Sequence, residues 1–211
     1  MAAGTAEAAL PKTRRGRETR AKLLEAAAAE FGERGYHEGA IAEITRRAGV
    51  AMGTFYVYFS SKEEIFRALV AHMSHETRGY IAAKVADAPD RLSAERAGLQ
   101  AFLEFARQHT NLYRIVMESQ FVAEDAYRDY YTGFADGYRR NLQRAVERGE
   151  IRAGDAEVRA WSLIGLSVFL GMRYAVWEPQ APLGPVVDGA FDLIERGLVP
   201  VEAMTAPGGR P

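Results

Sequence analysis

The residues best suited to chemistry lie between Ile41 and Lys62, and the chemistry they suit is non-covalent recognition of a polyanion. Thr54, Tyr56 and Lys62 supply two hydroxyl groups and one ammonium group within a short stretch. Such groups hold a protein on phosphate oxygens. The chain has no cysteine, which excludes disulfides, thiolate nucleophiles and cysteine metal sites.

Two short helices are expected to position these side chains. Ile41, Ile44 and Ala48 recur at helical spacing and predict a helix with one apolar face. Gly49 follows, where a left-handed residue beyond a helix end costs least as glycine. Residues 51–58 are predicted to form the second helix. A helix, a turn containing glycine and a second helix make the helix-turn-helix, whose second helix enters the major groove of DNA.

The stretch AGVAMGTFYVYFSSKEEIF resembles the signature of the tetracycline-repressor (TetR) family. Twelve residues match the family pattern in order and without gaps: Ala48, Gly49, Val50, Gly53, Thr54, Phe55, Tyr56, Tyr58, Phe59, Ser61, Lys62 and Glu63. The resemblance covers about Arg17 to Met73. It implies an all-α homodimer of about nine helices per chain, with an N-terminal helix-turn-helix domain and a C-terminal ligand-binding and dimerisation domain. It also implies a palindromic operator in double-stranded DNA, a small-molecule effector and no cofactor.

Four parts are expected along the chain: a flexible basic arm over residues 1–15, the DNA-binding domain over 16–62, the ligand-binding and dimerisation domain over 63–200, and a flexible tail over 201–211. Residues 1–62 carry ten Lys and Arg against seven Asp and Glu, whereas residues 63–211 carry seventeen against twenty-one. A basic end on an acidic body suits docking to phosphate. The basic run from Lys12 to Lys22 is either a solvated charge run or an arm that follows the DNA.

Carry-over from the family pattern places the DNA contacts on the two short helices and beside them: Arg17, Arg46, Ala51, Met52, Gly53, Thr54, Tyr56, Tyr58 and Lys62. Lys62 is expected to share a phosphate with the N-terminus of its own helix. Tyr58 either reaches a phosphate or packs against the first helix. Met52 and Val57 either meet thymine methyl groups or leave specificity to DNA shape.

Two helix caps are missing by comparison with the family pattern. Gly39 and Ala40 stand before the first short helix, and Ala51 before the second, where Ser or Thr is usual. Neither glycine nor alanine has a side-chain oxygen to accept a hydrogen bond. The other helices are predicted over about 17–34, 93–108, 111–119, 123–149 and 155–177, with one more beginning after Ser60 and a last one ending near residue 198.

Aromatic residues in the C-terminal half form either core or the wall of a small-molecule cavity. The candidates for the wall are Phe102, Tyr113, Met117, Phe121, Tyr130, Phe134 and Trp161, with His109, Arg114 and Glu118 as polar anchors. This lining favours an apolar or amphipathic effector, such as a fatty or aromatic acyl thioester or a drug-like compound. Arg114 is available for an anion.

The helix predicted over 155–177 is apolar on more than one face, so one face needs a partner. By resemblance, the last two helices of two chains form a four-helix dimer interface. The residues expected there are Ile164, Gly165, Val168, Gly171, Val187, Phe191 and Ile194.

Other classes of function find little support in the sequence. His72 and His75 lack a third metal ligand, and no phosphate-binding glycine loop or nucleophile motif indicates an enzyme. No signal peptide or membrane-spanning stretch is expected, which predicts a cytoplasmic protein without membrane contact. The alternatives left open are a constitutive dimeric DNA-binding protein and an activator without small-molecule control; a repressor is the family default.

Overall fold

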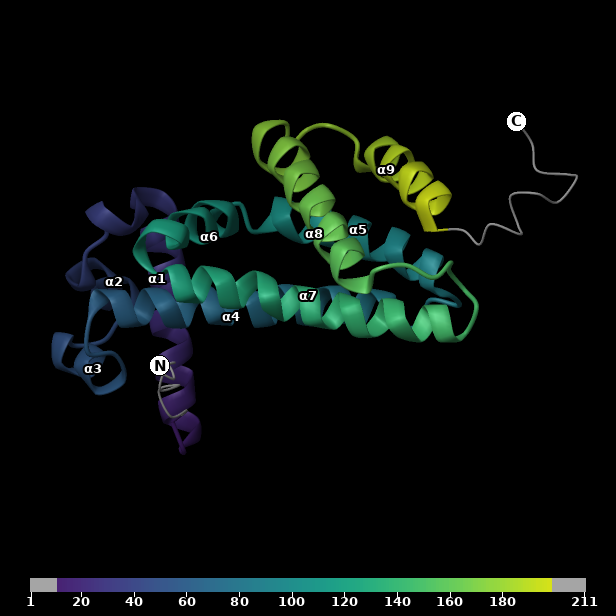
Figure 1. Ribbon diagram of the computed structural model, residues 1–211. Helices are drawn as coiled ribbons and strands as arrows, with labels where there is room; N and C mark the ends of the chain where they lie inside the picture. The colour runs from purple at the N-terminus through teal and green to yellow at the C-terminus, as the bar shows by residue number, and fades with distance from the viewer. Residues whose placement is uncertain (1–10, 199–211) are drawn as a thin grey trace, which may run out of the picture.

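The computed structural model describes residues 11–198, and this part of the chain is helical without strands (Figure 1). The helices are α1 (Arg14–Glu38), α2 (Ile41–Ala48), α3 (Met52–Tyr58), α4 (Lys62–Val85), α5 (Arg91–Gln108), α6 (Asn111–Val122), α7 (Glu124–Glu147), α8 (Ala156–Gly171), its π-helical continuation (Met172–Trp177) and α9 (Leu183–Leu198). The prediction of an all-α fold is confirmed. Residues 1–10 of the expected arm, and the expected tail, lie outside the described residues.

Two helix starts differ from the prediction for identifiable reasons. The Thr13 hydroxyl accepts a hydrogen bond from the Gly16 N–H (3.1 Å), and this cap starts α1 at Arg14, inside the stretch expected to be a flexible arm. The sequence also predicts a loop from Pro182 to Pro185, but helix α9 begins at Leu183, so Pro185 lies in its first turn. Proline is tolerated there because its missing N–H would have no helical partner.

The N-terminal core joins α1, α2, α3 and α4. Leu23, Phe31, Ile44, Phe55 and Phe66 are fully buried in it, and each contributes about 1.5–3 kcal/mol by burial. The rings of Phe31 and Phe66 meet edge to face with centroids 5.2 Å apart. The predicted boundary after residue 62 therefore precedes the first turns of α4, which complete this core.

The remaining helices form a longer body beside the N-terminal one. Helices α4 and α7 run along its length, and α8 and α9 lie on one side of it (Figure 1). A second core joins α7, α8 and α9 around Leu142, Ala160 and Ile194. A third joins α5 to α9 around Leu103 and Val187. Helix α6 packs on both α1 and α7, so it contacts the DNA-binding end as well as the body.

Helix α8 changes to π-helix at Met172, where the sequence predicted one continuous α-helix. The Tyr113 hydroxyl donates a hydrogen bond to the Val168 carbonyl (2.9 Å) at this point. A side chain that enters the helical hydrogen-bond ladder in this way is a known cause of a local change in helix geometry. Gly171 makes room for the phenol, because a Cβ there would lie 2.0 Å from the Tyr113 hydroxyl oxygen.

The segment Ala156–Trp177 passes a test of length and composition for a membrane span, with a mean hydropathy of 1.3. The sequence prediction had found no stretch of this kind. Core helices of water-soluble proteins pass the same test, and α8 packs against α5 and α7. The segment also carries Arg159 and Arg173.

Candidate DNA-binding surface and enclosed cavity

The turn between α2 and α3 has the geometry that the sequence predicted. Gly49 is left-handed (φ 67°, ψ 34°), and the Val50 N–H donates to the Thr45 carbonyl (3.1 Å). This is a Schellman-type helix end. It turns the chain so that α3 packs through Phe55, which is fully buried.

The outer face of α3 is exposed to solvent. Met52, Tyr56 and Val57 are 42%, 55% and 78% exposed, and Gly53 is exposed beside them. Thr54 is half-buried. Tyr58 is half-buried as well, and its hydroxyl oxygen lies 3.6 Å from the position of a Cβ on Gly16. The structure therefore favours the packing role for Tyr58 over phosphate contact.

The basic residues of α2 pair with acidic neighbours. Arg46 is exposed and its Nε donates to Glu43 (2.8 Å), and this hydrogen bond is the main reason why the pKa of Glu43 is lowered to about 2. Arg47 pairs with Glu33 (2.6 Å) and lies 3.3 Å from the buried Glu30. Arg46 thus lies where a phosphate can compete for it, whereas Arg47 joins α2 to α1.

Helix α2 begins without a side-chain cap, and Glu30 of α1 binds a different N–H, the one of the capping residue itself. Ala40 makes no side-chain cap, as expected. Its N–H instead donates to Oε1 of Glu30 (3.2 Å). Ala51 at the start of α3 also makes no side-chain cap, and it is exposed.

Lys62 lies elsewhere than the sequence predicted. Its Nζ donates to the carbonyls of Tyr36 (2.9 Å), His37 (3.1 Å) and Gly39 (3.0 Å), and it lies 4.6 Å from the centroid of the Tyr36 ring. An ammonium group has three N–H donors, and these carbonyls use all of them. The expected phosphate contact is corrected to a structural role: Lys62 holds the end of α1 against the start of α4.

The outermost predicted contact, Arg17, is exposed near the start of α1. Its Nη1 donates to the carbonyls of Pro11 (3.3 Å) and Lys12 (2.9 Å). The exposed DNA-binding candidates are thus Arg17, Arg46, Ala51, Met52, Gly53 and Tyr56.

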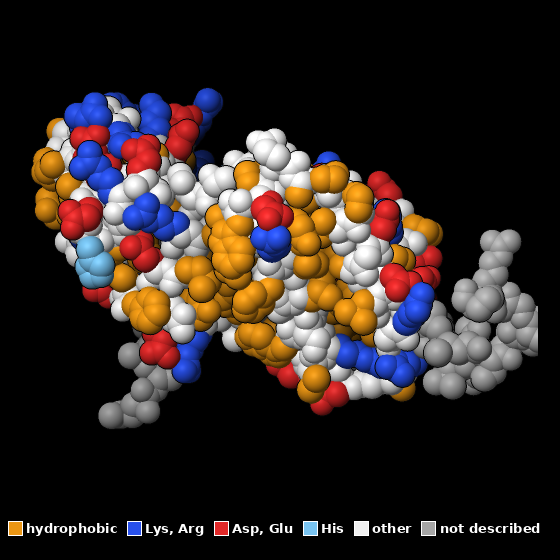
Figure 2. Space-filling model, turned by 90° about the horizontal axis from the view of Figure 1, so that it is seen from above, with side chains coloured by type: hydrophobic (Ala, Val, Ile, Leu, Met, Phe, Trp, Pro, Cys, Tyr) orange, Lys and Arg blue, Asp and Glu red, His pale blue; other side chains and the backbone are white. Residues whose placement is uncertain are grey.

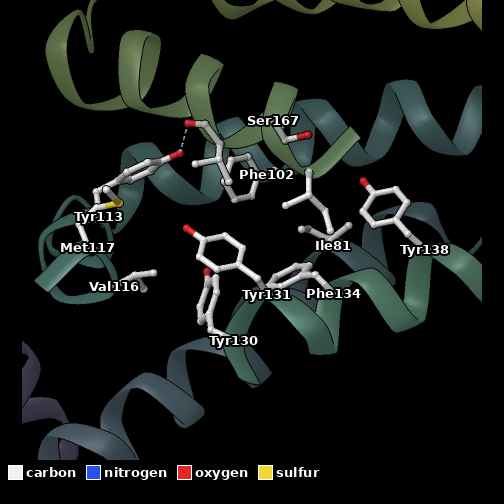
Figure 3. Close-up of a pocket in the computed structure, with 12 residues that line it drawn as sticks. Ile81, Phe102, Tyr113, Val116, Met117, Tyr130, Tyr131, Phe134, Tyr138 and Ser167 are labelled. Carbon is white, nitrogen blue, oxygen red and sulfur yellow. Dashed lines mark hydrogen bonds between the residues drawn. The ribbon is translucent and has the colours of Figure 1, made fainter. Parts of the chain in front are cut away.

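The body contains an apolar cavity between helices α4 to α8 (Figure 3). Its lining is dominated by aromatic and aliphatic side chains: Ile81, Phe102, Tyr113, Val116, Met117, Tyr130, Tyr131, Phe134, Tyr138, Ile164, Ser167 and Val168. None of these lining residues is acidic or basic. An apolar lining with a few hydroxyl groups is typical of small-molecule sites.

The polar atoms of the cavity are hydroxyl groups that stay neutral. Burial raises the pKa of Tyr113, Tyr131 and Tyr138 above the usual range and that of Tyr130 to about 12. The Ser167 hydroxyl donates to the Leu163 carbonyl (2.8 Å) and keeps lone pairs as acceptors. The enclosed part of a ligand is therefore expected to be uncharged, with few hydrogen-bonding atoms.

A wider hollow lies outside the cavity, between α6, α7 and α8. It shares Met117, Tyr131, Ile164 and Val168 with the cavity and adds Tyr127, Arg128, Thr132, Trp161, Gly165 and Phe169. Arg128 is the only charged residue in this lining. Figure 2 shows hydrophobic side chains gathered along the middle of the face that carries α8 and α9.

Comparison with known proteins identifies the family of the N-terminal end. The family described as bacterial regulatory proteins, tetR family, matches residues 23–69, which include α2, α3 and the turn between them. Residues 23–69 therefore carry a DNA-binding domain of the TetR family.

Two kinds of relative extend this result. The HTH-type transcriptional activator FasR of Mycolicibacterium smegmatis is 34% identical to this chain over 108 residues, which are 51% of this chain and 49% of that protein. The chain thus aligns with about half the length of that curated relative. FadR of Bacillus halodurans has the same fold with a TM-score of 0.74 at 20% identity, over 83% of this chain and 94% of that one. FadR of Bacillus subtilis in complex with stearoyl-CoA has a TM-score of 0.71 at 18% identity, over 82% and 96%.

The residues predicted to bind the effector divide into those in the cavity and those outside it. Five line the cavity: Phe102, Tyr113, Met117, Tyr130 and Phe134. Trp161 lines the outer hollow instead, and Phe121 is 86% exposed. His109 stacks on Phe105 with centroids 4.2 Å apart and is not part of the cavity lining. Tyr131 and Tyr138 lie on the same aromatic helix as Phe134, and this periodicity was the signal for them.

Arg114 and Glu118 are the two predicted anchors that the structure places on the opposite side of α6. Arg114 Nη1 donates to the carbonyls of Gly32 (3.1 Å) and Glu33 (2.8 Å). Glu118 Oε2 accepts from the Tyr36 N–H (2.9 Å). Both side chains contact α1, and the expectation that they hold a ligand in the cavity is corrected.

Most of the residues that the TetR-family resemblance predicted for a dimer face are buried within the chain or line the cavity. Ile164, Gly171, Val187 and Ile194 are buried within the chain, and Val168 lines the cavity. Gly165 and Phe191 are half-buried. The exposed apolar side chains of α8 and α9 are Val158, Trp161, Phe169 and Leu193.

Proposed function

We propose that this chain is a transcription regulator that binds operator DNA as a homodimer through α3 and releases it when a small molecule fills the tyrosine-lined cavity. The observation that carries the proposal is the pairing of an exposed recognition face on α3 with an apolar, uncharged cavity in the same chain. Helix α3 suits a major groove by its position in the helix-turn-helix. The relatives are named as transcription regulators, and no enzyme activity is proposed.

The cavity supports an apolar or amphipathic effector. Its lining carries no charge, so an anionic group on the ligand would remain in the outer hollow, beside Arg128. This corrects the choice of Arg114 for an anion. The complex of Bacillus subtilis FadR with stearoyl-CoA makes stearoyl-CoA a sensible first probe.

A first experiment tests the DNA-binding half of the proposal. Binding to the DNA upstream of the chain's own gene is measured by fluorescence anisotropy across a salt series, for wild type, Tyr56→Phe and the matched control Tyr174→Phe. We expect tight, salt-dependent binding that weakens in Tyr56→Phe alone, because only Tyr56 lies on the exposed face of α3. Equal binding by all three proteins would remove Tyr56 from the interface.

The same assay then tests effector control. Stearoyl-CoA and free stearate are titrated into the protein–DNA complex, together with a short acyl-CoA that lacks the long apolar chain. Release by the long-chain compounds alone would support the cavity as the effector site. Unchanged DNA binding with all of them would contradict a long-chain acyl effector and lead to a screen of neutral apolar compounds.

A second candidate function is transcription activation, because FasR is named as an activator. A reporter fused to the bound promoter distinguishes the two outcomes. Higher expression after deletion of the gene indicates a repressor, and lower expression indicates an activator.

A further inference from the structure

Helix α1 is broken once, at the point where α6 crosses it. Gly35 has φ 80° and ψ 171°, which is not helical, and the residues on either side of it are. In an uninterrupted α-helix the Tyr36 N–H donates to the Gly32 carbonyl four residues earlier. Here that N–H donates to Glu118 Oε2 (2.9 Å), and the Gly32 carbonyl accepts from Arg114 Nη1 (3.1 Å).

Arg114 and Glu118 therefore take the place of one helical hydrogen bond. Arg114 supplies the donor for Gly32, Glu118 supplies the acceptor for Tyr36, and the two residues lie one turn apart on α6. Both side chains lie close against the backbone at Gly35, since a Cβ there would lie 2.7 Å from Glu118 Oε1 and 2.9 Å from Arg114 Nη2. Side chains inserted into a helical ladder in this way kink the helix.

The far side of the kink is held from a second direction. The Tyr36 carbonyl accepts from Lys62 Nζ of α4 (2.9 Å), while its N–H is bound by Glu118 of α6. The peptide groups at Tyr36 are thus held between the two helices that lead from the DNA-binding end to the body. Any displacement of α6 relative to α4 is transmitted to this one residue.

The opposite face of α6 forms part of the cavity wall. Tyr113, Val116 and Met117 line the cavity (Figure 3), and each is adjacent in sequence to Arg114 or Glu118, or within two residues of one of them. A ligand that displaces the cavity-lining residues of α6 must also move Arg114 and Glu118, because all of them belong to one rigid helix.

We propose that Arg114 and Glu118 are positioning residues that set the pose of the helix-turn-helix by holding α1 open at Gly35, and that they carry the state of the cavity to α3. The inference rests on the proposed function and adds the route of its regulation. When α6 moves, the Tyr36 N–H is free to return to the Gly32 carbonyl. The segment after the kink, which leads directly into α2, then changes direction.

The test uses a double-mutant cycle that needs no identified ligand. Val168→Phe, or Ser167→Leu if the first variant fails to fold, fills the cavity from α8 in place of an effector. It is combined with Arg114→Met/Glu118→Leu, which removes the donor and the acceptor. DNA affinity is measured by anisotropy for each protein, with thermal unfolding as a check of folding.

We expect the filling variant to change DNA affinity about 5- to 150-fold in the wild-type background and less than about twofold once Arg114 and Glu118 are replaced. Sites that do not communicate give additive effects, so non-additivity is the signature of the route through α6. Glu118→Gln keeps an acceptor oxygen and is expected to behave as wild type. Arg139→Met/Asp136→Leu, which removes an ion pair of α7, serves as the control background and should preserve the effect.

The possible outcomes distinguish failure of the role of Arg114 and Glu118 from failure of effector control by the cavity. An equal effect of cavity filling in both backgrounds would overturn the role of Arg114 and Glu118 and leave effector control intact. No effect of filling in any background, with folded protein, would overturn control from the cavity itself. Loss of the effect in the Arg139→Met/Asp136→Leu background as well would show that ion-pair removal in general is responsible, which also contradicts the inference.

Discussion

At the scale of single residues, Lys62 is the most constrained, because its ammonium group donates hydrogen bonds to three carbonyl oxygens that follow the kink in α1. These carbonyls belong to a segment that ends one helix and starts the next, where backbone acceptors lack helical partners. A charged donor satisfies them more strongly than a neutral one. Its contribution is therefore to the stability of the domain rather than to the affinity for phosphate.

Replacing Lys62 with Met tests this assignment. We expect the free energy of unfolding to fall by about 1–3 kcal/mol, since hydrogen bonds from a charged donor are lost and carbonyls are left without partners. Chemical denaturation measures the change, and Lys22→Met, at an exposed position of α1, is the matched control. Unchanged stability together with a salt slope of DNA binding reduced by about one would restore the phosphate contact.

Two glycine-to-alanine substitutions are expected to change the stability of the protein in opposite directions. Gly35→Ala places a Cβ at φ 80° and within 3 Å of two side-chain atoms, so we expect a loss of about 1–3 kcal/mol. Gly79→Ala adds a Cβ that meets nothing within 4 Å, inside α4, and we expect a gain of about 0.5–1 kcal/mol from helix propensity. Thermal unfolding of both variants checks the pair, and a Gly35→Ala protein as stable as wild type would contradict the kink.

At the scale of the elements, helices α5 and α7 enclose an acidic group. Glu95 is 3% exposed and pairs with Arg91 of its own helix (3.0 Å), with Tyr138 of α7 nearby. Burial raises the pKa of Glu95 to about 7 against the opposing effect of Arg91, from an ordinary value of 4.5. The folded protein therefore binds this proton more tightly than the unfolded chain does.

The stability of the protein should depend on pH through Glu95. The stabilising effect of its proton is complete below about pH 4.5 and is lost as pH rises to about 7, at a cost of at most about 3 kcal/mol. Glu95→Gln removes this dependence, so its stability relative to wild type should increase between pH 5 and pH 8. Denaturant unfolding at the two pH values decides the matter; a constant difference between the proteins would refute the raised pKa.

The elements also show how far the sequence could predict the structure. The family signature and the 3.6-residue periodicity located α2, α3 and the turn at Gly49, because local geometry alone determines them. The kink at Gly35 and the roles of Lys62, Arg114 and Glu118 depend on contacts 20 or more residues apart along the chain, and local patterns do not report such contacts. A charged side chain at the right spacing for a ligand or phosphate is equally suited to an unpaired helix end.

The same limit applies to the cavity and to the dimer face. Aromatic periodicity in α6 and α7 predicted Tyr113, Tyr130 and Phe134, whereas Ile81 of α4 gave no signal in the sequence. Helix α8 is apolar around most of its surface, so the sequence could not say which of its residues face inward. The structure assigns Ile164 to the interior and leaves Phe169 outside.

For the whole molecule, the exposed apolar side chains of α8 and α9 predict where two chains meet. We expect Phe169→Glu combined with Leu193→Glu to convert the proposed dimer to monomers, because two charges would be buried without partners. Sedimentation equilibrium measures the change, and Phe121→Glu, on exposed α6, is the matched control. DNA affinity should fall in parallel, since both half-sites are no longer bound together. A dimer that survives the double substitution would place the interface elsewhere.

The residues shared by the cavity and the outer hollow bear on the rates of ligand uptake and release rather than on affinity. Met117, Tyr131, Ile164 and Val168 belong to both spaces. On the proposed function, we expect a molecule from solvent to reach the hollow first and to enter the cavity only when these side chains rotate. Uptake then levels off as ligand concentration rises, because the opening of the wall and not the encounter limits it. Release through the same wall is slow as well. Such a sensor ignores brief pulses of its ligand and holds its state after the supply has ended.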